Sequence, residues 1–187
     1  RRNEGADHNL SDSTRGVMTG LNINSNAQEG DQDPLGVTVF GDDGFTAQEG
    51  STNNNYINEN SVNIVAWNWK ANGGTTTTND ASATSVGTID SVYQANTTAG
   101  FSIVTYTGTG SNGTIAHGLG AVARMVIIKN RDQTDNWAVG HTDIGFSNHL
   151  QLNVTDASTS ASAVFNSTAP TSTVFSVGTN HKTNASS

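Results

Sequence analysis

Short apolar runs separated by turns rich in Gly, Asn and Asp recur along the whole chain. The two clearest are FSIVTYT at residues 101–107 and MVIIK at residues 125–129, which combine β-branched, aromatic and aliphatic residues. Further short runs that favour strands occupy residues 136–140, 149–154, 162–166 and 173–177. The pattern predicts an all-β fold of antiparallel strands with little or no helix.

The strongest strand signal of the first half is VNIVAWNW at residues 62–69. Alternate side chains of a strand point to opposite faces, and neither face of this run is fully polar. We therefore expect a central strand, with Trp67 and Trp69 on one face. Because the chain has few large hydrophobic side chains, both rings are expected in the core or in an interface, although two rings on one face also suit a sugar-stacking platform.

Two stretches predict turns or loops. Residues 41–44, GDDG, separate Phe40 from Phe45 and predict the turn of a β-hairpin. Residues 72–88 are rich in Thr, Ser, Asn and Gly and carry no large hydrophobic side chain. This composition predicts a linker or an extended surface loop.

The two halves of the chain are related in sequence. Residues 127–139 align with the start of the chain, which places Trp137 on His8 and Arg131 on Arg2, an offset near 130 residues. Farther on, residues 171–178 align with residues 40–48. We expect two related β-sandwich or jelly-roll-like units in tandem: the C-terminal part of a first unit (1–71), a linker (72–88) and a second unit lacking its last strand (89–187).

Composition narrows the class of partner. The 187 residues carry a net charge of −8, and the eight Lys and Arg residues are scattered, which argues against a nucleic-acid-binding surface. No apolar run approaches the roughly 20 residues of a membrane-spanning helix, so no membrane insertion is expected. Hydrophobic residues make up only 33%, so we expect apolar surface to be buried between copies, in a homo-oligomer such as a trimer.

One motif imitates a nucleotide site. Residues 108–113, GTGSNG, spell G-x-G-x-x-G directly after a predicted strand, and Asp132 follows where a ribose-binding acid would lie. A nucleotide site needs a helix to begin at the glycines. The following residues, TIAHGLGAVAR, hold two more glycines and no helical apolar stripe, so we expect two turns here, at the motif and at residues 117–120.

Acidic residues gather in the first half. Asp31, Asp33, Asp42 and Asp43 could supply oxygen ligands for Ca²⁺, which needs six to eight of them at one point. No known calcium-loop motif is present, and Asp is an ordinary turn residue, so turns are the favoured interpretation and no other cofactor is expected. The same carboxylates would have to face each other across a cleft to act as a glycosidase pair.

The remaining candidate ligand-binding residues are Trp137, His141 and Asp143. Trp137 could stack on a sugar ring, and His141 and Asp143 alternate along a predicted strand and could pair. The five histidines show no zinc-binding spacing, and no G-x-S-x-G nucleophile motif is present. We therefore expect a protein that is not an enzyme.

A family resemblance follows from six segments taken in order: NIVAWNWKANGG, NTTAGFSIVTYTGTGSN, HGLG, MVIIKNR, NWAV and TSTVFSVG. They resemble a β-rich repeat domain of marine bacteriophage virion structural and tail-fibre-like proteins, often encoded beside concanavalin-like modules. The resemblance implies a tail fibre, appendage or capsid-decorating module in the virion or extracellular space, with other virion proteins as partners. It implies no catalytic residues.

Two alternatives remain at this level. A lectin-like carbohydrate-binding module, which would hold a host-surface glycan, predicts an exposed Trp platform or an Asp-lined calcium site. A glycan-degrading enzyme predicts two carboxylates facing one cleft.

Overall fold

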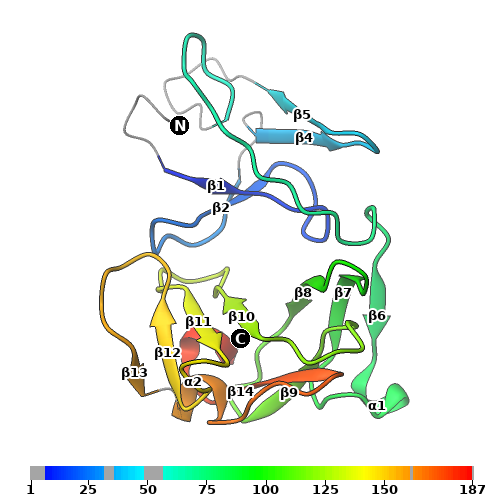
Figure 1. Ribbon diagram of the computed structural model, residues 1–187, viewed down its shortest axis with the longest axis vertical. Coiled ribbons are helices and arrows are strands. Elements are labelled where there is room, and N and C mark those ends of the chain that lie inside the picture. Colours follow the sequence, from blue (N-terminus) through cyan, green and yellow to red (C-terminus); the bar gives the residue numbers. More distant parts are fainter. Residues whose placement is uncertain (1–6, 32–35, 49–56, 161, 187) are drawn as a thin grey trace.

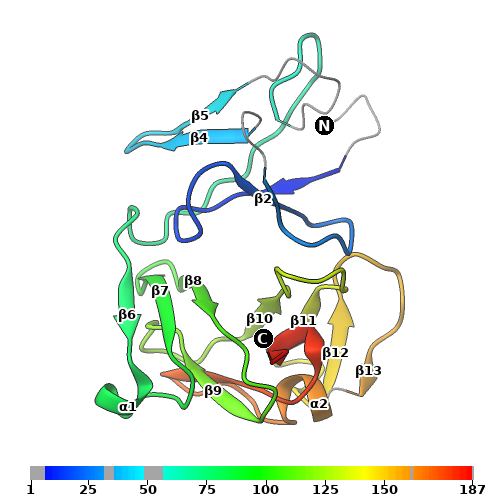
Figure 2. The ribbon, with the colours of Figure 1, turned by 180° about the vertical axis from the view of Figure 1, so that it is seen from behind.

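The computed structural model describes residues 7–31, 36–48, 57–160 and 162–186, which form two lobes (Figures 1 and 2). The upper lobe of Figure 1 contains β1 (Asn9–Leu10), β2 (Thr19–Asn22), β3 (Gly30–Asp31), β4 (Gly36–Phe40) and β5 (Phe45–Gln48). The lower lobe contains β6 (Thr77–Asn79), α1 (Ala81–Thr84), β7 (Ser91–Asn96), β8 (Phe101–Tyr106), β9 (Gly113–Ala116), β10 (Met125–Ile128), β11 (Ala138–His141), β12 (Asn148–Gln151), β13 (Thr159–Ser160), α2 (Ser162–Phe165), β14 (Val174–Val177) and α3 (His181–Asn184).

The all-β expectation is confirmed. The described strands form five small sheets, β1-β2-β3, β4-β5, β6-β7-β8, β14-β9 and β10-β11-β12-β13. The strand pairs are antiparallel, and a single parallel bridge joins Ile89 to Ile115. Tandem sandwiches are not confirmed by these small sheets. Among the described residues, no helix is long and apolar enough to cross a membrane.

The hydrophobic core lies in the lower lobe. It is formed by side chains from β9, β10, β11, α2 and β14, with Ile115, Phe165 and Val177 fully buried. The predicted strands at residues 101–107, 125–129 and 173–177 are confirmed as β8, β10 and β14. Residues 162–166 were expected as a strand and instead form the one-turn helix α2, because a short apolar run suits either element and here it buries Val164 and Phe165.

Residues 72–88, expected as a linker or an extended surface loop, contain two short elements of regular structure. β6 pairs with β7, and α1 follows directly, beginning at the N-cap Asp80. The Asp80 carboxylate accepts the backbone N–H groups of Ser82 and Ala83, at 3.0 and 3.1 Å. Buried Asn79 donates to the Val86 carbonyl at 2.9 Å. Polar side chains order this segment without large hydrophobic residues.

The G-x-G-x-x-G motif is a connection between β8 and β9, as the turn interpretation predicted. Its backbone N–H groups are already bound by α3: Thr109 N–H donates to Asn184 Oδ1 at 2.7 Å and Gly110 N–H to the Asn184 carbonyl at 3.1 Å. Buried Asn184 also donates to the Gly178 carbonyl at 2.7 Å. Since these two donors are bound within the fold, the loop does not present them to a phosphate.

The central strand expected at residues 62–69 is absent. These residues form neither helix nor strand, and Ile64, Val65, Trp67 and Trp69 are exposed. A strand exists only where a neighbouring strand accepts its backbone hydrogen bonds, and the described part of the chain places none beside this run. Neither Trp67 nor Trp69 therefore lies in the core, so that part of the expectation is wrong, and a place in an interface stays a prediction.

The structure shows a repeat with a constant spacing of 129 residues. Each residue pair that joins β1 to β2 or β2 to β3 has a counterpart in β11, β12 and β13 at this spacing; for example, Asn9 corresponds to Ala138 (138 − 9 = 129). β5 and β14 have the same spacing. The sequence alignment of His8 with Trp137 falls in this register.

Side-chain hydrogen bonds repeat at the same spacing. Asn24 Oδ1 accepts the backbone N–H of His8 at 2.7 Å, and Asn153 Oδ1 accepts that of Trp137 at 3.0 Å. The Nδ2 group of Asn24 donates to the side chain of Asp7, the residue before His8, at 2.9 Å. In the same way, Nδ2 of Asn153 donates to the side chain of Asn136, the residue before Trp137, at 2.8 Å. We call these two arrangements the asparagine clamps.

The lobes are joined by an ionic network around Glu29. The Glu29 carboxylate accepts Arg15 Nη1 at 2.5 Å and Arg131 Nε at 2.9 Å, and the Arg15 side chain is 4% exposed. Burial opposes ionisation of Glu29, but the hydrogen bonds from Arg131 and Arg15 outweigh it and hold the pKa of this carboxyl below its usual 4.5. The network therefore stabilises the fold only while Glu29 is ionised.

We predict that Glu29→Gln lowers the free energy of unfolding by about 2 kcal/mol at pH 7, because buried Arg15 loses a charged partner. A carboxyl with a lowered folded-state pKa stabilises the fold above its unfolded pKa, and this stability disappears as the pH falls through the folded pKa. Urea unfolding at several pH values should therefore show the wild type and the variant converging below about pH 4.5. Exposed Asp156→Asn is the control, and a constant difference across that range would contradict the prediction.

Candidate functional site

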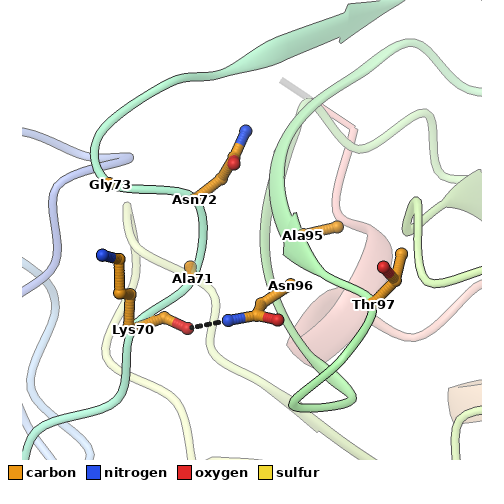
Figure 3. A pocket seen from close by; sticks show the side chains of 7 residues that line it. All are labelled: Lys70, Ala71, Asn72, Gly73, Ala95, Asn96 and Thr97. Carbon is orange, nitrogen blue, oxygen red and sulfur yellow. Dashed lines mark hydrogen bonds between the residues drawn. The ribbon is translucent and has the colours of Figure 1, made fainter.

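An open cleft of about 400 Å³ lies between the chain entering β6 and the end of β7. It is lined by Lys70, Ala71, Asn72, Gly73, Ala95, Asn96 and Thr97 (Figure 3). Asn96 Nδ2 donates across to the Lys70 carbonyl at 3.0 Å, which ties the two walls together. Asn96 Oδ1 accepts the Ala99 backbone N–H at 2.9 Å, so this side chain is held from both ends.

Aromatic rings lie beside this cleft. Trp69 directly precedes Lys70, and Phe101 is the cross-strand partner of Asn96. The Trp69 and Phe101 rings stack with centroids 6.2 Å apart and an interplanar angle of 25°. Trp69 is nevertheless 61% exposed and Trp67, two residues earlier in the chain, is 76% exposed, so both indole rings are open to solvent.

The chemistry of the cleft suits hydrogen bonding to a neutral polar ligand. Asn72 Nδ2 donates to the Thr75 carbonyl at 3.0 Å, which leaves its carbonyl oxygen, the Lys70 ammonium and the Thr97 hydroxyl as the groups that can bind a ligand. The described residues lining the cleft include no acid, histidine or cysteine. The arrangement can bind and orient a molecule, but it offers no acid–base or nucleophilic pair.

Sequence reasoning missed this site because it assigned both tryptophans to a core strand. The segment WNWKANGG held a usable signal: two aromatic residues followed at once by a Lys, an Asn and a double-Gly turn. Phe101 and Asn96 carried no such signal, because only the pairing of β7 with β8 brings them to Trp69 and Lys70.

Trp137, the ligand candidate from the sequence, is 4% exposed. Its indole Nε1–H donates to the carbonyls of Asn22 and Ser25, at 3.1 and 3.2 Å, and so fastens the lower lobe to the loop after β2. Asp135 N–H adds a bond to the Asn26 carbonyl at 2.8 Å. The ring is buried in a structural contact and presents no open face for a sugar in this structure.

His141 and Asp143 do lie together, at the other end of β11 from Trp137. The Asp143 backbone N–H donates to His141 Nδ1 at 3.1 Å, and Arg124 Nη2 contacts the Asp143 carboxylate at 3.2 Å. Arg124 and Asp143 are largely exposed, and such surface ion pairs contribute little to stability. The three predicted ligand residues therefore do not form one site.

The predicted calcium ligands that the structure describes lie on different elements. Asp42 and Asp43 are exposed on the turn between β4 and β5, where Gly41 N–H donates to the Gly44 carbonyl at 2.7 Å and confirms the predicted hairpin. Asp31 belongs to β3, and Asp33 lies outside the described residues. Within the described ranges, no three acidic, His or Cys side chains converge as a metal site would require. Calcium binding stays a prediction.

A second hollow, of about 340 Å³, lies where the lobes meet. His8, Ile23 and Asn24 line it from above, and residues 152–155 line it from below. The 129-residue repeat relates this hollow to the Trp137 contact, because residues 152–154 correspond to residues 23–25 beneath the Trp137 ring. The second half fills this position with the Trp137 indole, whereas the first half has the smaller His8 side chain there.

We predict that His8→Trp fills this hollow and raises the free energy of unfolding by about 1 kcal/mol, through apolar area removed from water. Thermal unfolding should show a higher Tm, and the new tryptophan should add blue-shifted fluorescence. Val122→Trp, which adds the same ring at an exposed loop position, is the control and should leave Tm unchanged. A Tm for His8→Trp at or below that of the wild type would refute the correspondence.

Comparison with known proteins gives a family but no function. Neither the curated proteins nor the solved structures contain a match to this chain. The family model described as "Domain of unknown function (DUF7483)" matches residues 1–187 of this chain. The chain belongs to the DUF7483 family.

Proposed function

We propose that this protein is a non-enzymatic adhesion module that binds a glycan through Trp67, Trp69 and the adjoining cleft. The observation that carries the proposal is the exposure of both rings. Apolar side chains of this size are normally buried, because each buried Å² contributes about 25 cal/mol. An exposed aromatic surface beside a polar cleft marks a binding site.

The chemistry of a sugar matches this combination. A pyranose ring has an apolar face of C–H groups and a rim of hydroxyls, so it needs a flat ring on one side and hydrogen-bonding groups at the edge. Trp67 and Trp69 provide the flat surface, and Lys70, Asn72 and Thr97 provide the edge. Since the chain carries a net charge of −8, a neutral glycan suits it better than a polyanionic one.

The proposed setting is the virion. The ordered motifs resemble phage virion and tail-fibre-like proteins, which implies a tail fibre, appendage or capsid-decorating module that contacts other virion proteins and copies of itself. A binding module on such an appendage would hold a host-surface glycan. The short strands and long loops suit that role, because loops on a rigid scaffold commonly carry recognition.

We predict that affinity electrophoresis through gels containing neutral polysaccharides (a β-glucan, a xylan, a galactomannan or agarose) retards the wild type. Trp69→Ala and Trp67→Ala should weaken the retardation at least about tenfold, because each removes a stacking surface. Met125→Ala, which truncates an exposed apolar side chain on β10, is the matched control and should bind as the wild type does. Equal retardation of the Trp variants, or no retardation of the wild type in any of these gels, would show the proposal to be wrong.

A separate prediction concerns the setting. Mass spectrometry of gradient-purified particles from the source culture should detect peptides of this chain, with copy number measured against the major capsid protein. A few copies per particle would indicate a fibre, and hundreds would indicate decoration of the capsid. Peptides found in the medium and missing from the particles would refute the virion setting while leaving glycan binding intact.

A further inference from the structure

The 129-residue repeat permits a comparison of equivalent polar side chains in the two halves. Three side chains of the first half correspond to three of the second: Asp7 to Asn136, Asn22 to Gln151 and Asn24 to Asn153. In each half the asparagine clamp joins the third side chain to the first. We call the two sets the first and the second polar triad.

In the second polar triad every side-chain amide oxygen has a donor. Gln151 Oε1 accepts Asn136 Nδ2 at 2.6 Å and Lys182 Nζ at 3.2 Å. Asn136 Oδ1 accepts Asn153 Nδ2 at 2.8 Å, and Asn153 Oδ1 accepts the Trp137 backbone N–H. An ammonium group from α3 is thus part of the hydrogen bonding of this triad.

The first polar triad is arranged differently because Asp7 is a carboxylate, which only accepts hydrogen bonds. Its two oxygens accept Asn22 Nδ2 at 3.1 Å and Asn24 Nδ2 at 2.9 Å. With Nδ2 of Asn22 directed at Asp7, the Asn22 Oδ1 atom is buried and has no hydrogen-bond partner. A buried oxygen without a partner is costly, so it indicates a group that belongs beside it.

The first polar triad also lacks the positive charge of the second. Asp7 forms no ion pair with any Lys or Arg side chain in the described part of the chain. The position equivalent to Lys182 is Asn53 (182 − 129 = 53), which lies outside the described residues and has an uncharged side chain. The first half therefore combines a carboxylate and an unpaired oxygen where the second half combines satisfied amides and an ammonium.

We infer that the first polar triad binds a monovalent cation of ammonium size, K⁺ or NH₄⁺, through Asn22 Oδ1 and the Asp7 carboxylate. Carbonyl oxygens coordinate K⁺ in place of its hydration water, and Asp7 supplies the opposite charge. One carboxylate and two amides offer too few oxygens for Ca²⁺, which takes six to eight. Asp7 is half-buried, so the ion can enter from solvent, and the net charge of −8 favours cations near the chain.

The test measures the Tm of the full chain at constant ionic strength. N-methylglucammonium chloride, whose cation is too large for the site, is replaced stepwise by KCl or by NH₄Cl up to about 0.2 M. A ligand that binds only the folded state raises Tm, and a site with a Kd of about 20 mM gives a rise of about 3 °C.

Asp7→Asn is the decisive variant, because it reproduces the second polar triad. An amide at this position can donate to Asn22 Oδ1, as Asn136 donates to Gln151. The variant should lose the rise in Tm with K⁺ and NH₄⁺ and should be at least as stable as the wild type without them. Asp156→Asn, which removes the same charge from an exposed loop position, is the matched control and should keep the rise.

A second measurement needs no variant. In ¹H–¹⁵N NMR spectra of the wild type, the side-chain NH₂ signals of Asn22 should shift on addition of KCl, and those of Asn153 should not. Equal Tm values in all three salts, a rise that persists in Asp7→Asn, or a response to CaCl₂ alone would overturn the inference. These readouts are independent of glycan binding at Trp67 and Trp69.

Discussion

Buried side-chain amides hold this structure together. A chain with only 33% hydrophobic residues cannot rely on apolar packing alone, and here Asn and Gln bind the backbone groups that packing would otherwise leave in water. Gln94 is buried and bonds Thr14 Oγ1 and the Gly74 N–H, both at 3.0 Å, thereby joining β7 to two distant turns. The Asn184 side chain likewise joins the loop before β9 to the Gly178 carbonyl. Each satisfied amide fixes one arrangement, since losing a partner leaves a buried polar group unpaired.

The asparagine clamps show how the same constraint acts twice. In both halves an Asn side chain binds the residue that enters the first strand, and the registers of this strand and the next two are identical. What differs is the clamped residue, His8 or Trp137. The indole fills its contact and binds two carbonyls of the opposite lobe, whereas the imidazole leaves a hollow. The contact between the lobes is therefore tighter at Trp137 than at His8, and the ion pairs of Glu29 with Arg15 and Arg131 add to it.

Alternation of apolar and polar residues was sufficient to predict β8, β10, β14 and the β4-β5 hairpin, because these elements are bounded by clear turns. It failed where side-chain hydrogen bonds replace hydrophobic pattern, as in residues 72–88, where Asp80 and Asn79 order the chain. It also failed at residues 62–69, because an apolar run becomes a strand only if another strand lies beside it. The burial of Trp137 and the exposure of Trp69 depend on contacts more than 30 residues away in sequence, which no local pattern encodes.

The exposed apolar residues of the first half are of two kinds. Phe45 corresponds to Val174 in β14, which is itself only half-buried, so the repeat offers a related position whose exposure calls for no ligand. Trp67 and Trp69 have no equivalent within residues 1–187, so the repeat offers no covered counterpart for them. Their assignment to a ligand depends on what adjoins them: a stacked Phe101 and a cleft of amide, ammonium and hydroxyl groups. Rings beside such a cleft can select a ligand both by its flat apolar face and by its hydroxyls.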